Sequence, residues 1–134
     1  MPVMRADIWR YLILWEKGGI FADLDVLPRQ DGSLLEHLQS SDNDEDATFV
    51  LVDTAGQQVL SQWFLAVAPH HPLMYYTVEE ATYRVLQAKQ AIPIQHTGPQ
   101  ALYDATDRFL SHRGRSVSRH LQVGELYVED LTAL

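Results

Sequence analysis

Two aspartates, Asp23 and Asp25, are the residues whose type and spacing most directly indicate chemistry. They lie in the apolar segment 20–27, and a strand holds residues i and i+2 on one face, so both carboxylates are predicted to project together. At about 6 Å and an effective dielectric of about 20, their repulsion is roughly 3 kcal/mol, which raises one pKa or requires a counter-cation. Hard divalent ions such as Mg²⁺ or Mn²⁺ suit such a pair, so the sequence predicts a metal site here.

A second charged pair, Asp7 and Arg10, precedes the aspartates on a predicted helix. The segment 4–17 has apolar residues at helical spacing, and Gly18-Gly19 ends it and lets the chain turn into the strand. Residues three apart share a helix face, so Asp7 and Arg10 are expected to interact. Taken alone, they are typical of a surface ion pair worth a few tenths of a kcal/mol.

The rest of the chain predicts a layered domain with helices between apolar strands. Strands are predicted at 20–27, 48–53, 63–68 and 121–128, the last one at a sheet edge. Helices are predicted at 4–17, 33–37 (one turn), 74–88 and from 97 onward, with 92–94 extended and 40–46 an acidic loop. The run 63–68 also permits a helix if it is extended back to Val59. The fold class is therefore α/β or α+β with a mostly buried sheet, and the two carboxylates lie at an end of that sheet.

Composition excludes several function classes. The chain has 134 residues, 46% of them hydrophobic and 21% charged, which indicates one globular domain without a run long enough to span a membrane. The formal charge of −8 argues against nucleic acid or anionic membranes as the main partner. Because there is no cysteine, disulfides and thiolate metal sites are excluded.

The histidines are predicted to be structural. His70 and His71 are adjacent, so they point in different directions on most backbones, and they lie in a Pro-His-His-Pro sequence typical of a loop entering a helix rather than of a zinc site. His96, His112 and His120 are expected to be surface or capping residues.

Three sequence strings together resemble one known family. They are A-D-I-W-R-Y at 6–11, G-G-I-F-A-D-L-D at 18–25, and, less specifically, Q-W-F-L-A at 62–66 with T-G-P at 97–99. The combination of D-x-x-R-Y, G-G and D-x-D at this spacing resembles the DXD-containing sugar-nucleotide glycosyltransferases. That family includes initiating mannosyltransferases and capsular polysaccharide transferases, and more distantly the clostridial glucosylating toxins.

The resemblance implies a fold and a reaction. The fold is a GT-A-like nucleotide-diphospho-sugar transferase fold, represented by the central and later part of the domain, with a mixed sheet flanked by helices. The reaction is retaining transfer of a hexose from a UDP- or GDP-sugar to a glycan, lipid or protein acceptor, with Mn²⁺ or Mg²⁺ on the diphosphate.

The resemblance also implies roles for individual residues. Asp25 would bind the metal, and Asp23 would contact the ribose or donor sugar and can reach the cation through water; these two are the predicted catalytic residues. Asp7 and Arg10 would approach the donor sugar from the preceding helix. Phe21 stands where the family often has Tyr, and its ring can still stack in the donor site.

The resemblance also predicts that residues 1–134 are a single but incomplete domain. Family members carry an earlier βα portion that holds the nucleotide and a later segment with His, Ser and Trp, and neither is found here, so full activity from this chain alone is not expected. The localisation expected is the cytoplasm for a bacterial protein, or the Golgi lumen, with an anchor outside this chain, for a eukaryotic one.

Two alternatives to a working transferase remain at this point. One is a non-catalytic or truncated glycosyltransferase-like domain. The other is a phosphatase of the haloacid-dehalogenase type, in which the first Asp of D-x-D is a nucleophile and the second a general acid. That pattern requires Thr or Val four residues after the first Asp, where this chain has Leu27.

Overall fold

The computed structural model describes residues 2–26, 49–53, 60–90, 92–112, 114 and 126–129. Its helices are α1 (Pro2–Lys17), α3 (Pro72–Gln87), α4 (Pro93–His96) and α5 (Pro99–Ser111). Its strands are β1 (Gly19–Ala22), β2 (Phe49–Asp53), β3 (Leu60–Val67) and β4 (Leu126–Glu129). The helical turn predicted at 33–37 and the acidic loop at 40–46 lie outside the described residues.

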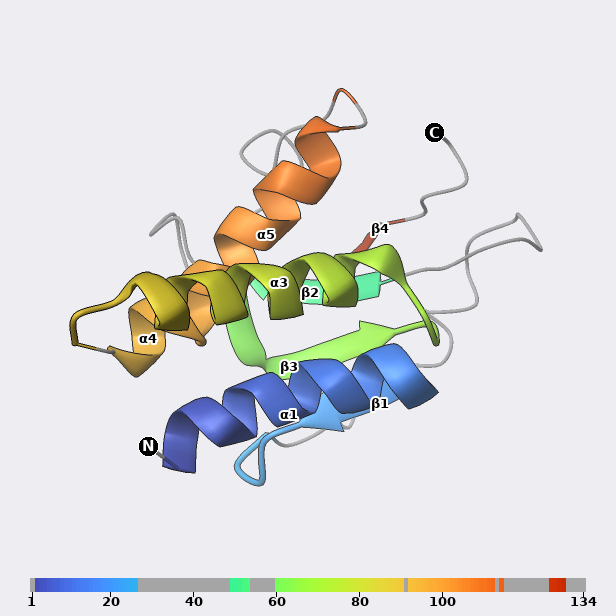
Figure 1. Cartoon of the computed structure of the whole chain (residues 1–134). Helices are drawn as coiled ribbons and strands as arrows, with labels where there is room; N and C mark the ends of the chain where they lie inside the picture. Colours follow the sequence, from blue (N-terminus) through green and yellow to red (C-terminus); the bar gives the residue numbers. More distant parts are fainter. Residues whose placement is uncertain are drawn as a thin grey trace.

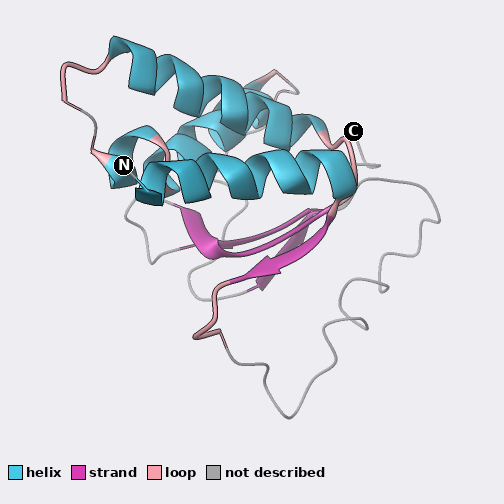
Figure 2. Ribbon diagram, turned by 60° about the horizontal axis from the view of Figure 1, so that its bottom comes forward, coloured by secondary structure: helices cyan, strands magenta, loops and turns pink. Residues whose placement is uncertain are grey.

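The four strands form one sheet in the order β1-β3-β2-β4, with the described helices on one face (Figures 1 and 2). All three pairings are antiparallel. The layered α/β arrangement agrees with the prediction. The prediction of a mixed sheet is wrong for the described strands, because all of their pairings are antiparallel. Only residues 54–59 separate β2 from β3, and a connection this short can close a hairpin, whereas parallel neighbours need a crossover of a dozen or more residues.

Strand β3 carries an irregularity that matters for the site. Its pairing with β2 shifts from Val50↔Ala66 to Val52↔Ser61, so residues 62–65 of β3 lie opposite a single residue of β2. Within this segment β3 pairs with β1 instead, through Phe64↔Ala22. Such bulges bend a strand and re-aim its side chains and carbonyls. Residues 62–65 therefore leave the regular ladder with β2, while Phe64 and Leu65 stay paired with β1.

The reversal from α1 into β1 depends on two glycines. Gly18 and Gly19 have φ angles of 64° and 99°, a region that L-residues other than glycine rarely adopt. A Cβ atom on Gly18 would also lie 2.5 Å from the backbone nitrogen of Pro69, so there is no room for a side chain. The predicted helix stop is confirmed, and β1 runs back beneath α1 (Figure 1).

The apolar core lies between the helices and β3. It includes Tyr11 and Leu14 of α1, together with residues of β3, α3 and α5, and its members are buried almost completely. The remaining members are Leu60, Leu65, Val67, Leu73, Met74, Leu102, Phe109 and Leu110. In the part of the chain that the structure describes, no helix is both long and apolar enough to cross a membrane.

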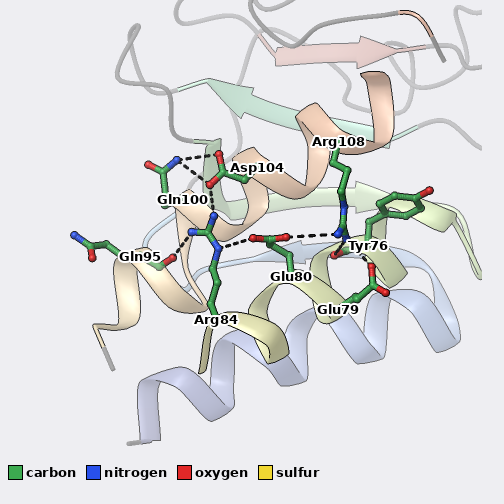
Figure 3. Close-up of polar contacts among 8 residues, drawn as sticks. All are labelled: Tyr76, Glu79, Glu80, Arg84, Gln95, Gln100, Asp104 and Arg108. Atoms are coloured by element: carbon green, nitrogen blue, oxygen red, sulfur yellow. Dashed lines mark hydrogen bonds and ion pairs between the residues drawn. The ribbon is translucent and has the colours of Figure 1, made fainter. Parts of the chain in front are cut away.

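A polar network at the surface fastens α3 to α4 and α5 (Figure 3). Arg84 of α3 donates hydrogen bonds to Glu80, to the backbone carbonyl of Gln95 and to Asp104 of α5. Burial alone would lower the pKa of Arg84, but its hydrogen bonds with Glu80 and Asp104 outweigh that effect and raise the pKa. The guanidinium therefore stays charged and ties the three helices together.

The observed elements confirm two local predictions, at 69–72 and 63–68, and contradict one, at 92–94. The helix entry at 69–72 is confirmed, because His71 is the N-cap of α3 and its Nδ1 accepts a hydrogen bond from the backbone N–H of Leu73. The strand at 63–68 is confirmed as part of β3, and the helical alternative is wrong. The extended segment at 92–94 is also wrong, since α4 begins there. Pro93 stands in its first turn, where a fixed φ suits a helix and the missing N–H costs nothing.

Candidate active site

The D-x-D aspartates lie in a turn just beyond β1. Strand β1 ends at Ala22, and the backbone N–H of Val26 donates a hydrogen bond to the carbonyl of Asp23 at 3.0 Å. The prediction that Asp23 and Asp25 share one strand face is therefore wrong, because the strand is too short to include them. The prediction that they lie at an end of the sheet is confirmed, because Asp23 directly follows the last residue of β1. The side chain of Asp23 is 40% exposed, and Asp25 is exposed.

The pair Asp7–Arg10 is buried in the interior. Arg10 Nη2 lies 3.3 Å from Asp7 Oδ1, and the residues are only 9% and 1% exposed, respectively. The surface ion-pair alternative is wrong, because this face of α1 is covered by other parts of the fold. Arg10 also reaches outward, since its Nη1 donates to the carbonyl of Gln62 at 2.8 Å and lies 3.8 Å from Asp23 Oδ1.

The ring of Phe21 supports the guanidinium of Arg10. The Cζ atom of Arg10 lies over this ring, 4.5 Å from its centroid, which is the geometry of a cation–π contact. Phe21 belongs to β1 and is half-buried. Arg10 is thus held between Asp7, Phe21 and Asp23, so four of the five predicted site residues come together. The fifth, Asp25, lies two residues further along the turn.

The carboxylate of Asp7 has two further partners that the sequence analysis did not assign to the site. Gln62 of β3 donates from Nε2 to Asp7 Oδ1 at 2.9 Å, and Thr97 donates from Oγ1 to Asp7 Oδ2 at 2.7 Å. The hydroxyl of Tyr11 lies 2.7 Å from Gln62 Oε1 and 3.0 Å from the carbonyl oxygen of Thr97. The signals in the sequence were the strings Q-W-F-L-A at 62–66 and T-G-P at 97–99, which carried part of the family resemblance but gave neither residue a role in the site.

Burial fixes the protonation state of Tyr11. Its environment raises the pKa of Tyr11 far above the ordinary value, first through burial and second through the nearby charge of Asp7, while Arg10 acts in the opposite direction. The phenol therefore keeps its proton and acts as a donor to Gln62 or Thr97.

The D-x-D turn offers ligands of the type that a divalent cation prefers. The carboxylate of Asp25 is exposed and has no hydrogen bond or ion pair with any described residue, so its oxygens are available. Within the described ranges there is no group of three or more acidic or histidine side chains that could hold a metal. Mg²⁺ and Mn²⁺ suit oxygen ligands, and Mg²⁺ usually takes only one or two carboxylates together with water and substrate phosphates, which fits this ligand set.

Comparison with known proteins connects this site to a family. Residues 1–44 match the family described as glycosyltransferase sugar-binding region containing DXD motif, and this match covers all five predicted site residues. The predicted resemblance to the DXD glycosyltransferases is confirmed. The chain is also 26% identical to the initiation-specific alpha-1,6-mannosyltransferase of Schizosaccharomyces pombe, across 100% of this chain and 36% of that protein. It therefore spans about a third of the length of this mannosyltransferase.

A solved structure shows the same fold. The chain matches PaToxG Glycosyltransferase with a TM-score of 0.54 and 16% sequence identity, over 81% of this chain and 35% of that one. The predicted fold class, part of an α/β glycosyltransferase domain, is confirmed by this similarity.

Proposed function

We propose that this chain carries the donor site of a metal-dependent, retaining hexosyltransferase with a GT-A-like fold. It would transfer a hexose from a UDP- or GDP-sugar to a glycan, lipid or protein acceptor. The observation that supports this most directly is the position of Arg10, held by Asp7, Phe21 and Asp23 beside the D-x-D turn. All of these residues lie in the part of the chain that matches the DXD glycosyltransferases.

Arg10 is suited to recognise the donor. A guanidinium has five N–H donors in a rigid fork, and Arg10 uses Nη1 and Nη2 for Gln62 and Asp7, so donor capacity is left for a hydroxyl of the donor sugar. Asp7 is buried, so in this arrangement it acts on the site by holding the guanidinium of Arg10 in one orientation. Asp23 is more exposed and would contact the ribose or the donor sugar directly.

The carboxylates explain why a cation is needed. A nucleoside diphosphate is an anion, and the turn presents Asp23 and Asp25 to it, so direct binding would be repulsive. A divalent cation, Mn²⁺ or Mg²⁺, would bind Asp25 and the diphosphate oxygens and stabilise the charge that builds on the leaving group. Asp25 is the proposed ligand because its carboxylate is exposed and is not used by a described partner.

The relatives guide the choice of donor for a first test. One relative is named as a mannosyltransferase, which makes GDP-mannose the first probe and UDP-glucose the second. Similarity to glycosyltransferases in both sequence and fold favours sugar transfer over the phosphatase alternative.

The test is calorimetric titration of the full-length protein with each nucleotide sugar, with Mn²⁺ and with excess chelator. We expect Mn²⁺-dependent binding of one of the two, and at least about 100-fold weaker binding by Asp25→Asn, because a metal ligand is lost. Absence of metal-dependent binding of both donors would contradict the proposal. Binding without release of the nucleoside diphosphate, in the presence or absence of acceptor, would identify a non-catalytic relative instead.

A further inference from the structure

A polar network around Asp7 and Arg10, buried except at the half-buried Gln62, joins three distant parts of the chain. It includes Gln62 of β3 and Thr97, which lies between α4 and α5. We propose that Gln62 and Thr97 are positioning residues, which hold Asp7, and through it Arg10, in the arrangement that binds the donor sugar. This inference rests on the proposed function and adds to it the residues that make the arrangement rigid.

Gln62 contacts both members of the Asp7–Arg10 pair. An ionised carboxylate only accepts hydrogen bonds, so the amide nitrogen of Gln62 must face Asp7, and the amide oxygen then faces the hydroxyl of Tyr11. The backbone carbonyl of Gln62 accepts a hydrogen bond from Arg10 Nη1. Gln62 lies in the irregular segment 62–65, where β3 leaves the regular pairing with β2.

Thr97 holds the other oxygen of the same carboxylate. It is fully buried, and its hydroxyl lies 2.7 Å from Asp7 Oδ2. The position of Thr97 is itself fixed by close packing, since a Cβ atom on the adjacent Gly98 would lie 3.0 Å from both Ile94 Cα and the carbonyl oxygen of Pro93. The backbone N–H groups of Thr97 and Gly98 both donate to that carbonyl, at 3.0 and 2.8 Å.

The convergence of these donors on one carboxylate indicates a role in the site as well as in the fold. Both oxygens of Asp7 are engaged from outside α1, so its side chain is held in one rotamer, and the guanidinium of Arg10 is oriented by Asp7 on one side and by Gln62 on the other. A donor fixed before the substrate arrives avoids the entropic cost of ordering it during binding. Loosening Asp7 should therefore weaken contacts with the sugar more than contacts with the metal-bound diphosphate.

The experiment compares two buried threonines in the full-length protein. Thr97→Val removes the hydroxyl that contacts Asp7, whereas Thr106→Val removes a buried hydroxyl that bonds only to the carbonyl of Leu102 in its own helix. Affinities for GDP-mannose and GDP, or for UDP-glucose and UDP, are measured with Mn²⁺. We expect Thr97→Val to weaken binding of the nucleotide sugar about 10-fold while the nucleoside diphosphate binds within about twofold of wild type.

The controls separate a positioning role from a general loss of structure. Thr97→Ser keeps the hydroxyl and should restore wild-type affinity, and Thr106→Val should bind both ligands normally. If Thr97→Val folds and either binds the nucleotide sugar normally or loses both ligands equally, the inference is wrong while the proposed function stands. If Thr97→Val does not fold, Gln62→Met is judged by the same comparison. If the wild type binds neither donor, the proposed function fails and the inference with it.

Discussion

Two arginine–carboxylate networks in this protein contain the same chemical groups but differ in burial and in location. In the first, Arg10 pairs with Asp7, whose side chain is 1% exposed. In the second, Arg84 pairs with Glu80 and Asp104, whose side chains are 17% and 37% exposed (Figure 3). The first lies beside the D-x-D turn and the second on the outside of the helical layer. The difference in burial predicts which network serves the site and which one only joins helices.

Burial changes what an ion pair contributes. A pair taken out of water loses hydration, and its replacement by apolar residues is often neutral or stabilising. A partly exposed pair costs less to form but gains little, because water and salt screen it. The buried network is therefore an inefficient way to stabilise a fold, and its place beside Asp23 agrees with a functional reason for keeping it. Four predictions test this contrast, in order of decreasing effect on stability.

The largest effect is expected from Asp7→Ala. The substitution leaves the guanidinium of Arg10 buried without its main partner, and it also removes the acceptor for Gln62 and Thr97. We expect the free energy of unfolding in urea to fall by about 3–5 kcal/mol. The matched change Asp104→Ala, at the partner of Arg84, should cost only about 1 kcal/mol. Equal costs for the two substitutions would contradict the contrast.

The next effect is expected from Gln62→Ala. Gln62 is half-buried, but this change removes a donor to Asp7 and an acceptor for Tyr11, which are both buried, so the free energy of unfolding should fall by about 2 kcal/mol. Gln100→Ala is the control, because Gln100 contacts only Asp104 within the described ranges, at 3.2 and 3.3 Å, in the partly exposed network. Denaturant unfolding should show a change below about 0.5 kcal/mol for Gln100→Ala. A larger loss of unfolding free energy for Gln100→Ala than for Gln62→Ala would contradict the contrast between the two networks.

Gln62 and Thr97 show which features of this fold local sequence patterns can predict and which they cannot. Helix α1, its glycine stop and the start of α5 at Thr97-Gly98-Pro99 were predictable because their signals lie within a few residues. The role of Gln62 was not, since its partners Asp7 and Arg10 lie more than fifty residues away and no spacing rule connects them. The position of Thr97 next to a helix start was predicted, but its contact with Asp7 arises from the packing of α4 against α1.

The D-x-D segment shows a second limit. Its apolar residues predicted a strand through Leu27, yet β1 ends at Ala22 and the aspartates lie in a turn. Strand length depends on the partner strand, and β3 pairs with β1 only from Phe64 to Val67. The chemistry of the carboxylates was predictable from residue type, whereas their geometry depended on a distant strand.

A moderate effect is expected from Arg84→Met. Arg84 contacts α4 and α5 together, so its loss should lower the free energy of unfolding by about 1 kcal/mol. Because the network is partly exposed, the loss should shrink when denaturation is repeated in about 1 M NaCl, where the screening length is about 3 Å. Binding of the nucleotide sugar should stay at the wild-type value. A change in donor affinity would show that this network is not separate from the site.

The smallest effect is expected from Glu79→Gln. Arg108 joins the partly exposed network because its Nη1 lies 3.7 Å from Glu80 Oε2. Glu79 accepts a hydrogen bond from Arg108 at 2.7 Å, but its side chain is 52% exposed. Thermal unfolding should therefore reveal a change of less than about 0.5 kcal/mol. A loss comparable to that of Asp7→Ala would mean that exposure does not distinguish the two networks.

The central claim, that Arg10 and the D-x-D turn form one nucleotide-sugar site, is tested most directly by one titration series. The affinities for GDP-mannose and GDP, or for UDP-glucose and UDP, are measured in Mn²⁺ for wild type, Arg10→Lys and Asp25→Asn. Lysine keeps the charge but lacks the planar fork, so Arg10→Lys should lose about 10-fold in affinity for the nucleotide sugar and little for the nucleoside diphosphate. Asp25→Asn should lose both. If Arg10→Lys binds the nucleotide sugar as tightly as wild type, or Asp25→Asn keeps metal-dependent binding, the account is wrong.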